Sequence, residues 1–164
     1  MTLSRFIATW FGVGLLRPAP GTWGTLAALP FAWALHQLGG FPLLALATVA
    51  VFALGWWVSV IETRNSADPD PSEIVIDEVA GMWLALWPVS FGAQMMGADI
   101  LRLWPGWVVA FLAFRLFDIW KPGPAGWADR LHTPLGLMLD DIFAGVFAAV
   151  VVVVAAAVSH GVLM

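Results

Sequence analysis

Residues 137–158 read LMLDDIFAGVFAAVVVVVAAAV, an apolar stretch interrupted only by Asp140 and Asp141 near its start. A bilayer is crossed by a helix of about twenty predominantly apolar residues, and this stretch is long enough. Its second half, from residue 150 to residue 158, contains only valine and alanine, a composition typical of a helix that faces lipid. The stretch therefore predicts a membrane-spanning helix.

The composition of the whole chain extends this prediction. Of its 164 residues, 61% are hydrophobic and 11% are charged, whereas soluble domains carry about 25% charged residues. The chain contains no cysteine, which excludes disulfides, thiolate metal sites and cysteine nucleophiles. The net charge of -4, without a basic patch, argues against a nucleic-acid partner. We expect one integral-membrane domain over residues 1–164.

The remaining apolar stretches set the expected architecture. They cover residues 25–38, 41–61, 74 or 79 to 96, and 103–120. Gly39-Gly40 and Pro42 are turn residues, so the first two stretches should form a tight helical hairpin. Residues 6–16 are too short to cross a bilayer and predict an interfacial or re-entrant helix. We therefore expect an all-α polytopic bundle of about five spans plus this N-terminal helix.

The basic residues predict an orientation, because Lys and Arg are retained on the cytoplasmic side of a membrane protein. With alternating connections, one side receives Arg5, Arg17, Arg64, Lys121 and Arg130. The other side receives only Arg102, and Arg115 falls inside the fourth span. The first side should therefore be cytoplasmic.

The acidic residues gather on that same side. Only Asp99 falls opposite; the other ten are Glu62, Asp68, Asp70, Glu73, Asp77, Glu78, Asp118, Asp129, Asp140 and Asp141. Several of them begin apolar spans, where an unpaired buried charge is costly. We therefore expect a cationic ligand at this face.

Three groups of ionisable residues should meet at one level of the bundle. Asp77-Glu78 begins the third span, Asp140-Asp141 begins the fifth, and Arg115 and Asp118 share one face of the fourth. Small residues follow the acids at a spacing of four: Gly81 after Asp77, Ala144 and Ala148 after Asp140, and Gly145 and Ala149 after Asp141. Such residues allow close helix contact. The alternative interpretation of each acid pair is a favourable interaction with the helix N-terminus.

Carboxylates without histidine or cysteine are the ligands that hard cations such as Mg²⁺ prefer. A bound Mg²⁺ could polarise a phosphoryl oxygen and activate water. Residues 17–25, RPAPGTWGT, place a cation, hydroxyls and glycines directly before a helix, where backbone N–H groups favour an anion. The same residues can form an ordinary N-cap, but their position beside the acids favours phosphate binding. Arg115 and Lys121 could add contacts to the phosphate.

The chain resembles the phosphatidylglycerophosphatase A family of bacterial membrane phosphatases. The resemblance rests on four blocks: PGTWGT (20–25), DPSEIVIDEVAGMW (70–83), FRLFDIWKPGP (114–124) and GLMLDDIFAG (136–145). It implies Mg²⁺-dependent removal of the terminal phosphate from phosphatidylglycerophosphate, which yields phosphatidylglycerol. It also implies a multi-pass protein of the bacterial inner membrane whose active site faces the cytoplasm.

The resemblance also implies roles for individual residues. Metal binding falls to Asp77, Glu78, Asp118, Asp140 and Asp141, with Asp70 and Asp129 as outer candidates, and phosphate contacts fall to Arg17, Thr22, Arg115 and Lys121. Among the catalytic acids Asp77, Glu78 and Asp118, either Glu78 or Asp118 could be the general base toward the attacking water. A phospho-aspartyl intermediate is also chemically possible.

Two other classes of protein could use intramembrane acids. A small cation transporter or channel should distribute its acids through the membrane depth, whereas these collect at one interface. A noncatalytic lipid-binding scaffold would not need two acidic pairs. The small-residue stripes could pack helices within one chain or between two copies, so an oligomer is possible.

Overall fold

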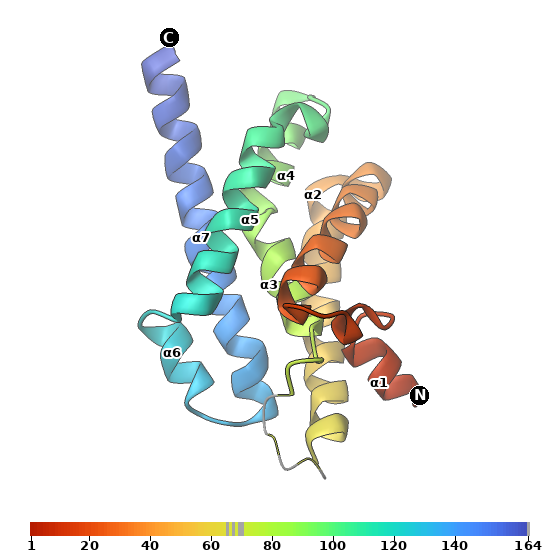
Figure 1. Cartoon of the computed structure of the whole chain (residues 1–164). Coiled ribbons are helices and arrows are strands. Elements are labelled where there is room, and N and C mark those ends of the chain that lie inside the picture. Colours follow the sequence, from red (N-terminus) through yellow and green to blue (C-terminus); the bar gives the residue numbers. More distant parts are fainter. Residues whose placement is uncertain (65, 67, 69–70, 164) are drawn as a thin grey trace.

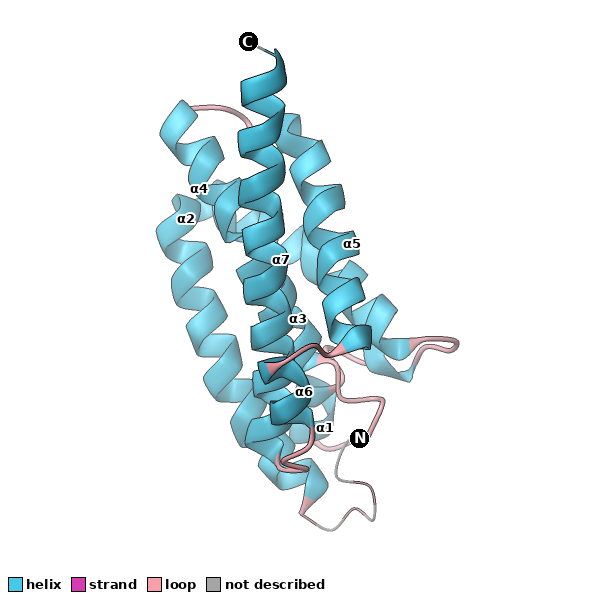
Figure 2. Cartoon of the chain, turned by 90° about the vertical axis from the view of Figure 1, so that its left-hand side faces the viewer, coloured by secondary structure: helices cyan, strands magenta, loops and turns pink. Residues whose placement is uncertain are grey.

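The computed structural model describes residues 1–64, 66, 68 and 71–163, with side chains through residue 159. Its helices are α1 (Leu3–Ala8), η1 (Val13–Leu15), α2 (Pro20–Thr63), α3 (Ile76–Ala85), α4 (Trp87–Met96), η2 (Ile100–Leu103), α5 (Trp104–Trp120), α6 (Pro124–Asp129) and α7 (Pro134–Leu163). The described residues contain no strand (Figure 2), which confirms the all-α prediction.

Within the part of the chain that the structure describes, three helical stretches are long and apolar enough to cross a membrane: Pro20–Thr63, Ile100–Trp120 and Pro134–Ser159. The protein is therefore a helical membrane protein. The predicted count of about five spans is not confirmed, because α2 counts as one of these three stretches and the expected third span is divided into two short helices.

The long helix α2 contains a reversal of direction. Gly39 and Gly40 have non-helical backbone angles, and Gly40 has a φ of 63°. Gly24 packs against Val75 while Gly55 packs against Ile76, although a straight helix would hold these two glycines about 46 Å apart at 1.5 Å per residue. The two arms, residues 20–38 and 41–63, therefore lie side by side as a hairpin (Figure 1), at the turn that the sequence predicts.

The expected third span, residues 74 or 79 to 96, is two helices of ten residues each, α3 and α4. They meet at Leu86, which ends α3 and precedes α4. Pro88 lies in the first turn of α4, where its missing N–H leaves no helical hydrogen bond unmade. Neither helix alone is long enough to cross a bilayer.

The N-terminal segment is also shorter than expected. Instead of one helix over residues 6–16, α1 ends at Ala8, and the positive φ values of Trp10, Phe11 and Gly12 turn the chain before η1. Ser4 and Ala8 bond this segment to Glu62 and to the backbone of Val75. The segment therefore lies at the end of the bundle that also holds α6 (Figure 1), a short helix that the sequence analysis did not predict.

Helix α3 forms the centre of the bundle. It contacts α2, α5 and α7, and all its residues except Glu78 and Leu84 are buried. Gly81 and Gly145 face one another where α3 crosses α7, and a Cβ on Gly145 would overlap the carbonyl oxygen of Gly81. The small residues predicted to allow close contact thus bring the acidic starts of α3 and α7 together.

Candidate active site

The acids of α3 and α7 form one cluster. Carboxylate oxygens of Asp77, Glu78 and Asp141 all lie within 4.8 Å of one another. The side chains of Asp77 and Asp141 are buried, with exposures of 7% and 3%. Because like charges at this separation repel strongly when shielded from water, the cluster is arranged to hold a cation or a proton.

The local structure explains how the cluster forms. Asp77 and Glu78 lie in the first turn of α3, and the Asp77 carboxylate accepts the backbone N–H of Glu78 at 3.0 Å. The helix N-terminus stabilises these two acids. Asp141 lies two turns into α7, where the helix-terminal effect has faded, so the macrodipole alone does not account for its position.

Glu78 contributes an unsatisfied group. Its Oε2 is buried and has no hydrogen-bond partner in the described structure. Its Oε1 packs directly against Gly21 at the start of α2. A Cβ added to Gly21 would overlap that oxygen and would lie 3.3 Å from the Glu78 Cδ. A buried carboxylate oxygen without a donor is costly, so the residues present fit a metal ion, which would satisfy it.

Helix α5 adds one cation and one more acid. Arg115 and Asp118, one turn apart, form an ion pair in which both side chains are mostly shielded from solvent. The Arg115 Nη1 lies 3.2 Å from the position that a Cβ on Gly21 would take, next to Glu78. Asp118 interacts electrostatically with both Glu78 and Asp141. The guanidinium is thus placed to meet an anion at the edge of the cluster.

Lys121 has acidic partners of its own. Its Nζ lies 2.7 Å from the Asp140 Oδ2 and also pairs with the Asp129 carboxylate. Burial by itself lowers the pKa of Lys121, but the two carboxylates outweigh it and raise the pKa above its usual value. Lys121 therefore ties α6 to the start of α7, and its predicted contact with phosphate stays a prediction.

The other predicted residues lie around this centre. Arg17 is exposed and donates to the Ser72 hydroxyl at 3.2 Å, ahead of α3. Thr22 is partly buried in the first turn of α2, directly after Gly21. Asp70 lies outside the described residues. The structure therefore gathers Asp77, Glu78, Arg115, Asp118 and Asp141 closely, places Lys121, Asp129 and Asp140 in an adjoining network, and sets Arg17 against Ser72.

Neither the close approach of Gly21 to Glu78 nor the contribution of α6 was predicted from the sequence. A glycine directly after Pro20 was a signal for the first, since such a position can allow an unusually close contact. Pro124 after the turn residues Pro122 and Gly123 was a signal for the second, because proline is favoured in the first turn of a helix.

The model of the phosphatidylglycerophosphatase A family matches residues 6–156. The chain belongs to this family. It is 36% identical over 147 residues to phosphatidylglycerophosphatase A of Escherichia coli (strain K12), covering 88% of this chain and 78% of that one. It is 36% identical over 150 residues to the Haemophilus influenzae protein of the same name, covering 90% and 85%.

A third relative bears another name. A Bacteroides thetaiotaomicron protein, provisionally named a phosphatidylinositol-3-phosphatase, is 34% identical over 158 residues and 93% of each chain is covered. No solved structure matches the chain. Membership of the family makes the protein a phosphatase, as the resemblance implied, and does not favour the transporter or channel.

Proposed function

We propose that this phosphatase hydrolyses phosphatidylglycerophosphate to phosphatidylglycerol and phosphate, depends on Mg²⁺, and acts at the cytoplasmic face of the bacterial inner membrane. The names of the two relatives at 36% identity support the substrate. The observation that carries the proposal is the cluster of Asp77, Glu78 and Asp141 with Arg115 beside it. Carboxylates that hold a metal ion, with a guanidinium beside them, would supply the positive charge that a phosphate monoester needs.

Asp77, Glu78 and Asp141 are the residues that would hold the metal ion, with Asp118 next to them. Their oxygens converge within 4.8 Å, and the buried Glu78 Oε2 still needs a partner. An all-carboxylate donor set favours Mg²⁺ over metals that prefer nitrogen or sulfur. When bound, Mg²⁺ supplies positive charge that stabilises the negative charge developing on the phosphoryl oxygens.

The side chains divide the remaining work. Arg115 binds phosphate oxygens through its planar guanidinium, which Asp118 holds in orientation. Glu78 or Asp118 takes the proton of the attacking water as its oxygen forms a bond to phosphorus. The bond from phosphorus to the glycerol oxygen breaks as the new bond forms, and the glycerol oxygen takes up the proton that the carboxylate accepted, which gives the alcohol. Lys121 keeps Asp140 in place beside Asp141.

A phospho-aspartyl route remains the second chemical possibility. In it a carboxylate, not water, forms the first bond to phosphorus, and water then releases the phosphate. Acid quenching during turnover of a substrate whose terminal phosphate carries ³²P distinguishes the routes, because an acyl phosphate holds the label on the protein whereas direct attack by water leaves the protein unlabelled.

We further propose that the chain crosses the membrane five times. Each arm of α2 would make one crossing. The other three crossings would be made by α3 together with α4, by the stretch from η2 through α5, and by α7. A broken span such as α3 and α4 is tolerated where protein surrounds it, and α3 is almost wholly buried. The basic residues at the acidic end favour the cytoplasm for the active site.

Phosphate release in detergent micelles tests the proposed activity. Purified protein is supplied in parallel with phosphatidylglycerophosphate, phosphatidic acid and phosphatidylinositol 3-phosphate, each with Mg²⁺ or with EDTA. We expect the highest kcat/KM with phosphatidylglycerophosphate, loss of release in EDTA, and recovery when Mg²⁺ is added back. Preference for phosphatidylinositol 3-phosphate would contradict the substrate, and full release in EDTA would contradict the metal dependence.

A further inference from the structure

A cavity opens at the end of the bundle that also holds the acidic cluster, between α1, the end of α2 and the segment before α3. Its volume is about 360 Å³, and its lining includes the polar residues Arg5, Thr9, Glu62, Ser66 and Glu73. Pockets of a few hundred Å³ are the usual size for small ligands. Its lining does not include Asp77, Glu78 or Asp141, so the cavity is separate from the candidate active site.

The cavity carries charges of both signs. Arg5 pairs with Glu73 at 2.5 Å through one nitrogen, and its side chain is 45% exposed, so most of its five N–H donors remain open. Glu62 accepts hydrogen bonds from the hydroxyls of Ser4 and Thr2. Within the part of the chain that the structure describes, no Lys or Arg pairs with Glu62.

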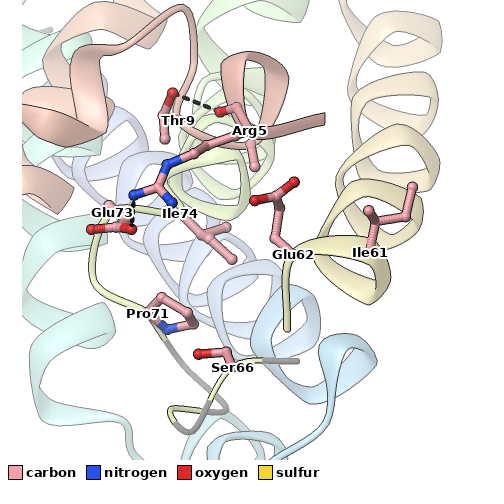
Figure 3. A pocket seen from close by; sticks show the side chains of 9 residues that line it. Arg5, Thr9, Ile61, Glu62, Ser66, Pro71, Glu73 and Ile74 are labelled. Carbon is pink, nitrogen blue, oxygen red and sulfur yellow. Dashed lines mark hydrogen bonds and ion pairs between the residues drawn. The ribbon is translucent and has the colours of Figure 1, made fainter. Parts of the chain in front are cut away.

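Figure 3 shows the Arg5 guanidinium turned toward Glu73, the Glu62 carboxylate on the other side of the opening, and Ser66 and Pro71 further along it. The cavity therefore offers a donor surface for an anion and, across from it, a carboxylate that lacks a cation. A ligand with a phosphate and an ammonium group a few bonds apart complements both walls.

The surroundings of the cavity place it at the membrane surface. Leu3 on α1 is 73% exposed, and Phe6, Leu15 and Leu16 are exposed on the same N-terminal segment. A short segment with exposed apolar residues beside polar ones is typical of chain that lies in the headgroup region. Lipid headgroups are thus the nearest source of such a ligand.

We propose that this cavity binds the headgroup of a phospholipid that carries a primary ammonium, with the ammonium at Glu62 and the phosphate at Arg5. Such a headgroup is a phosphodiester, which a phosphatase acting on terminal phosphates does not cleave. The site is therefore a structural lipid site that anchors α1 against α2, and it stands whether or not the proposed substrate is correct.

Native mass spectrometry of the full chain in detergent tests the proposal. The probes are dioctanoyl phosphatidylethanolamine and dioctanoyl phosphatidylcholine, which differ in the three methyl groups that remove the ammonium N–H donors. We expect the ethanolamine lipid to bind about tenfold more tightly. Glu62→Gln should abolish this preference, and Asp99→Asn, which removes the same charge at the opposite end of the bundle, should retain it.

A second variant guards against misfolding of Glu62→Gln. Ser66→Trp fills the exposed mouth of the cavity without changing charge, and it should weaken binding of the ethanolamine lipid while the melting temperature stays that of the wild type. Equal binding of the two lipids by the wild type, or an unchanged preference in Glu62→Gln, would overturn the proposal. Competition by free phosphoethanolamine at the same concentration as the lipid would overturn the assignment to a lipid.

Discussion

Glu78 lies where α2, α3 and α5 meet. Gly21 of α2 packs on its Oε1, Arg115 of α5 lies beside that contact, and its Oε2 is buried without a donor. A side chain held this tightly has a defined position before any ligand arrives. Preorganisation of this kind is what a phosphoryl-transfer site requires, because small displacements of catalytic groups are expensive in rate.

The contact between Gly21 and Glu78 gives the first prediction. In Gly21→Ala the added Cβ overlaps the Glu78 Oε1 and forces that carboxylate to move. We expect kcat for phosphate release to fall by about 10- to 100-fold, with little change in the melting temperature. Gly92→Ala is the matched control, since a Cβ there meets nothing within 4 Å, and it should keep wild-type activity. Equal activities of the two variants would contradict the role given to Gly21.

At the residue scale, local spacing was enough to predict that the acids of α3 and α7 lie close together and that small residues allow it; the roles of these acids stay predictions. Asp77 with Gly81, and Asp141 with Gly145, repeat every four residues along a helix and so share a face. The partners of Lys121 did not follow from spacing. They depend on the positive φ of Lys121 and on the packing of α6 against α7, which only the assembled chain determines.

The crossing of α3 and α7 is the element-level feature on which the site depends. Helices approach this closely only where the residues on both surfaces are small. Gly145→Val places a branched side chain against the Gly81 carbonyl. We expect a loss of about 1–3 kcal/mol in the free energy of unfolding together with loss of Mg²⁺-dependent activity, because the acids of the two helices separate.

Thermal unfolding and phosphate release measure this prediction. The neighbouring substitution Val146→Leu is the control, since Val146 is exposed on the outer face of α7. It should leave both the melting temperature and kcat near their wild-type values. A Gly145→Val protein with full activity would show that the crossing does not position the acids.

Lys121 connects α5, α6 and α7 through Asp129 and Asp140. Its pKa is raised in the folded state, so its stabilising effect is complete below the unfolded value of about 10.4 and is lost only as the pH rises through the higher folded value. Lys121→Gln should therefore lower the melting temperature by the same amount at about pH 6 and about pH 9.

The measurement is a melting curve at each pH beside Arg102→Gln, which removes an exposed positive charge at the opposite end of the bundle. This control should melt like the wild type throughout. If the destabilisation by Lys121→Gln disappears at the higher pH, the ion pairs of Lys121 do not have the strength assigned to them.

Among the elements, the sequence predicted α5, α7 and the reversal at Gly39-Gly40, because long apolar runs and paired glycines are strong local signals. It did not predict the division between α3 and α4. Trp87-Pro88 was available as a signal for a helix start, but the apolar character continues through it. Apolar residues favour burial in a membrane and do not specify one helix or two.

At the scale of the whole molecule, the ion pairs of the described residues gather at one end of the bundle. Arg5, Glu73, Lys121 and Asp140 pair with partners at one end, whereas His36 and Ser90 hydrogen-bond near the turn at Gly40. The order of the apolar stretches and of the charged residues predicts that most charged residues lie at one end. The side of the membrane that each end faces stays a prediction.

Single-cysteine labelling tests the orientation, and the natural chain has no cysteine to interfere. Leu38→Cys, 81% exposed beside the hairpin turn, should react with an impermeant maleimide in spheroplasts. Ser72→Cys, exposed before α3, should react only after the membrane is permeabilised. The reverse pattern would place the acidic end outside the cytoplasm.

We propose that the acids of α3 and α7 form one metal-dependent phosphatase centre. The most direct test is kcat for phosphate release from phosphatidylglycerophosphate with Mg²⁺, compared among the wild type, Asp141→Asn and Asp99→Asn. Each variant loses one carboxylate charge, but only Asp141 lies in the cluster. We predict a decrease of about 100-fold or more for Asp141→Asn and wild-type rates for Asp99→Asn. Undiminished release by a folded Asp141→Asn protein would contradict the account.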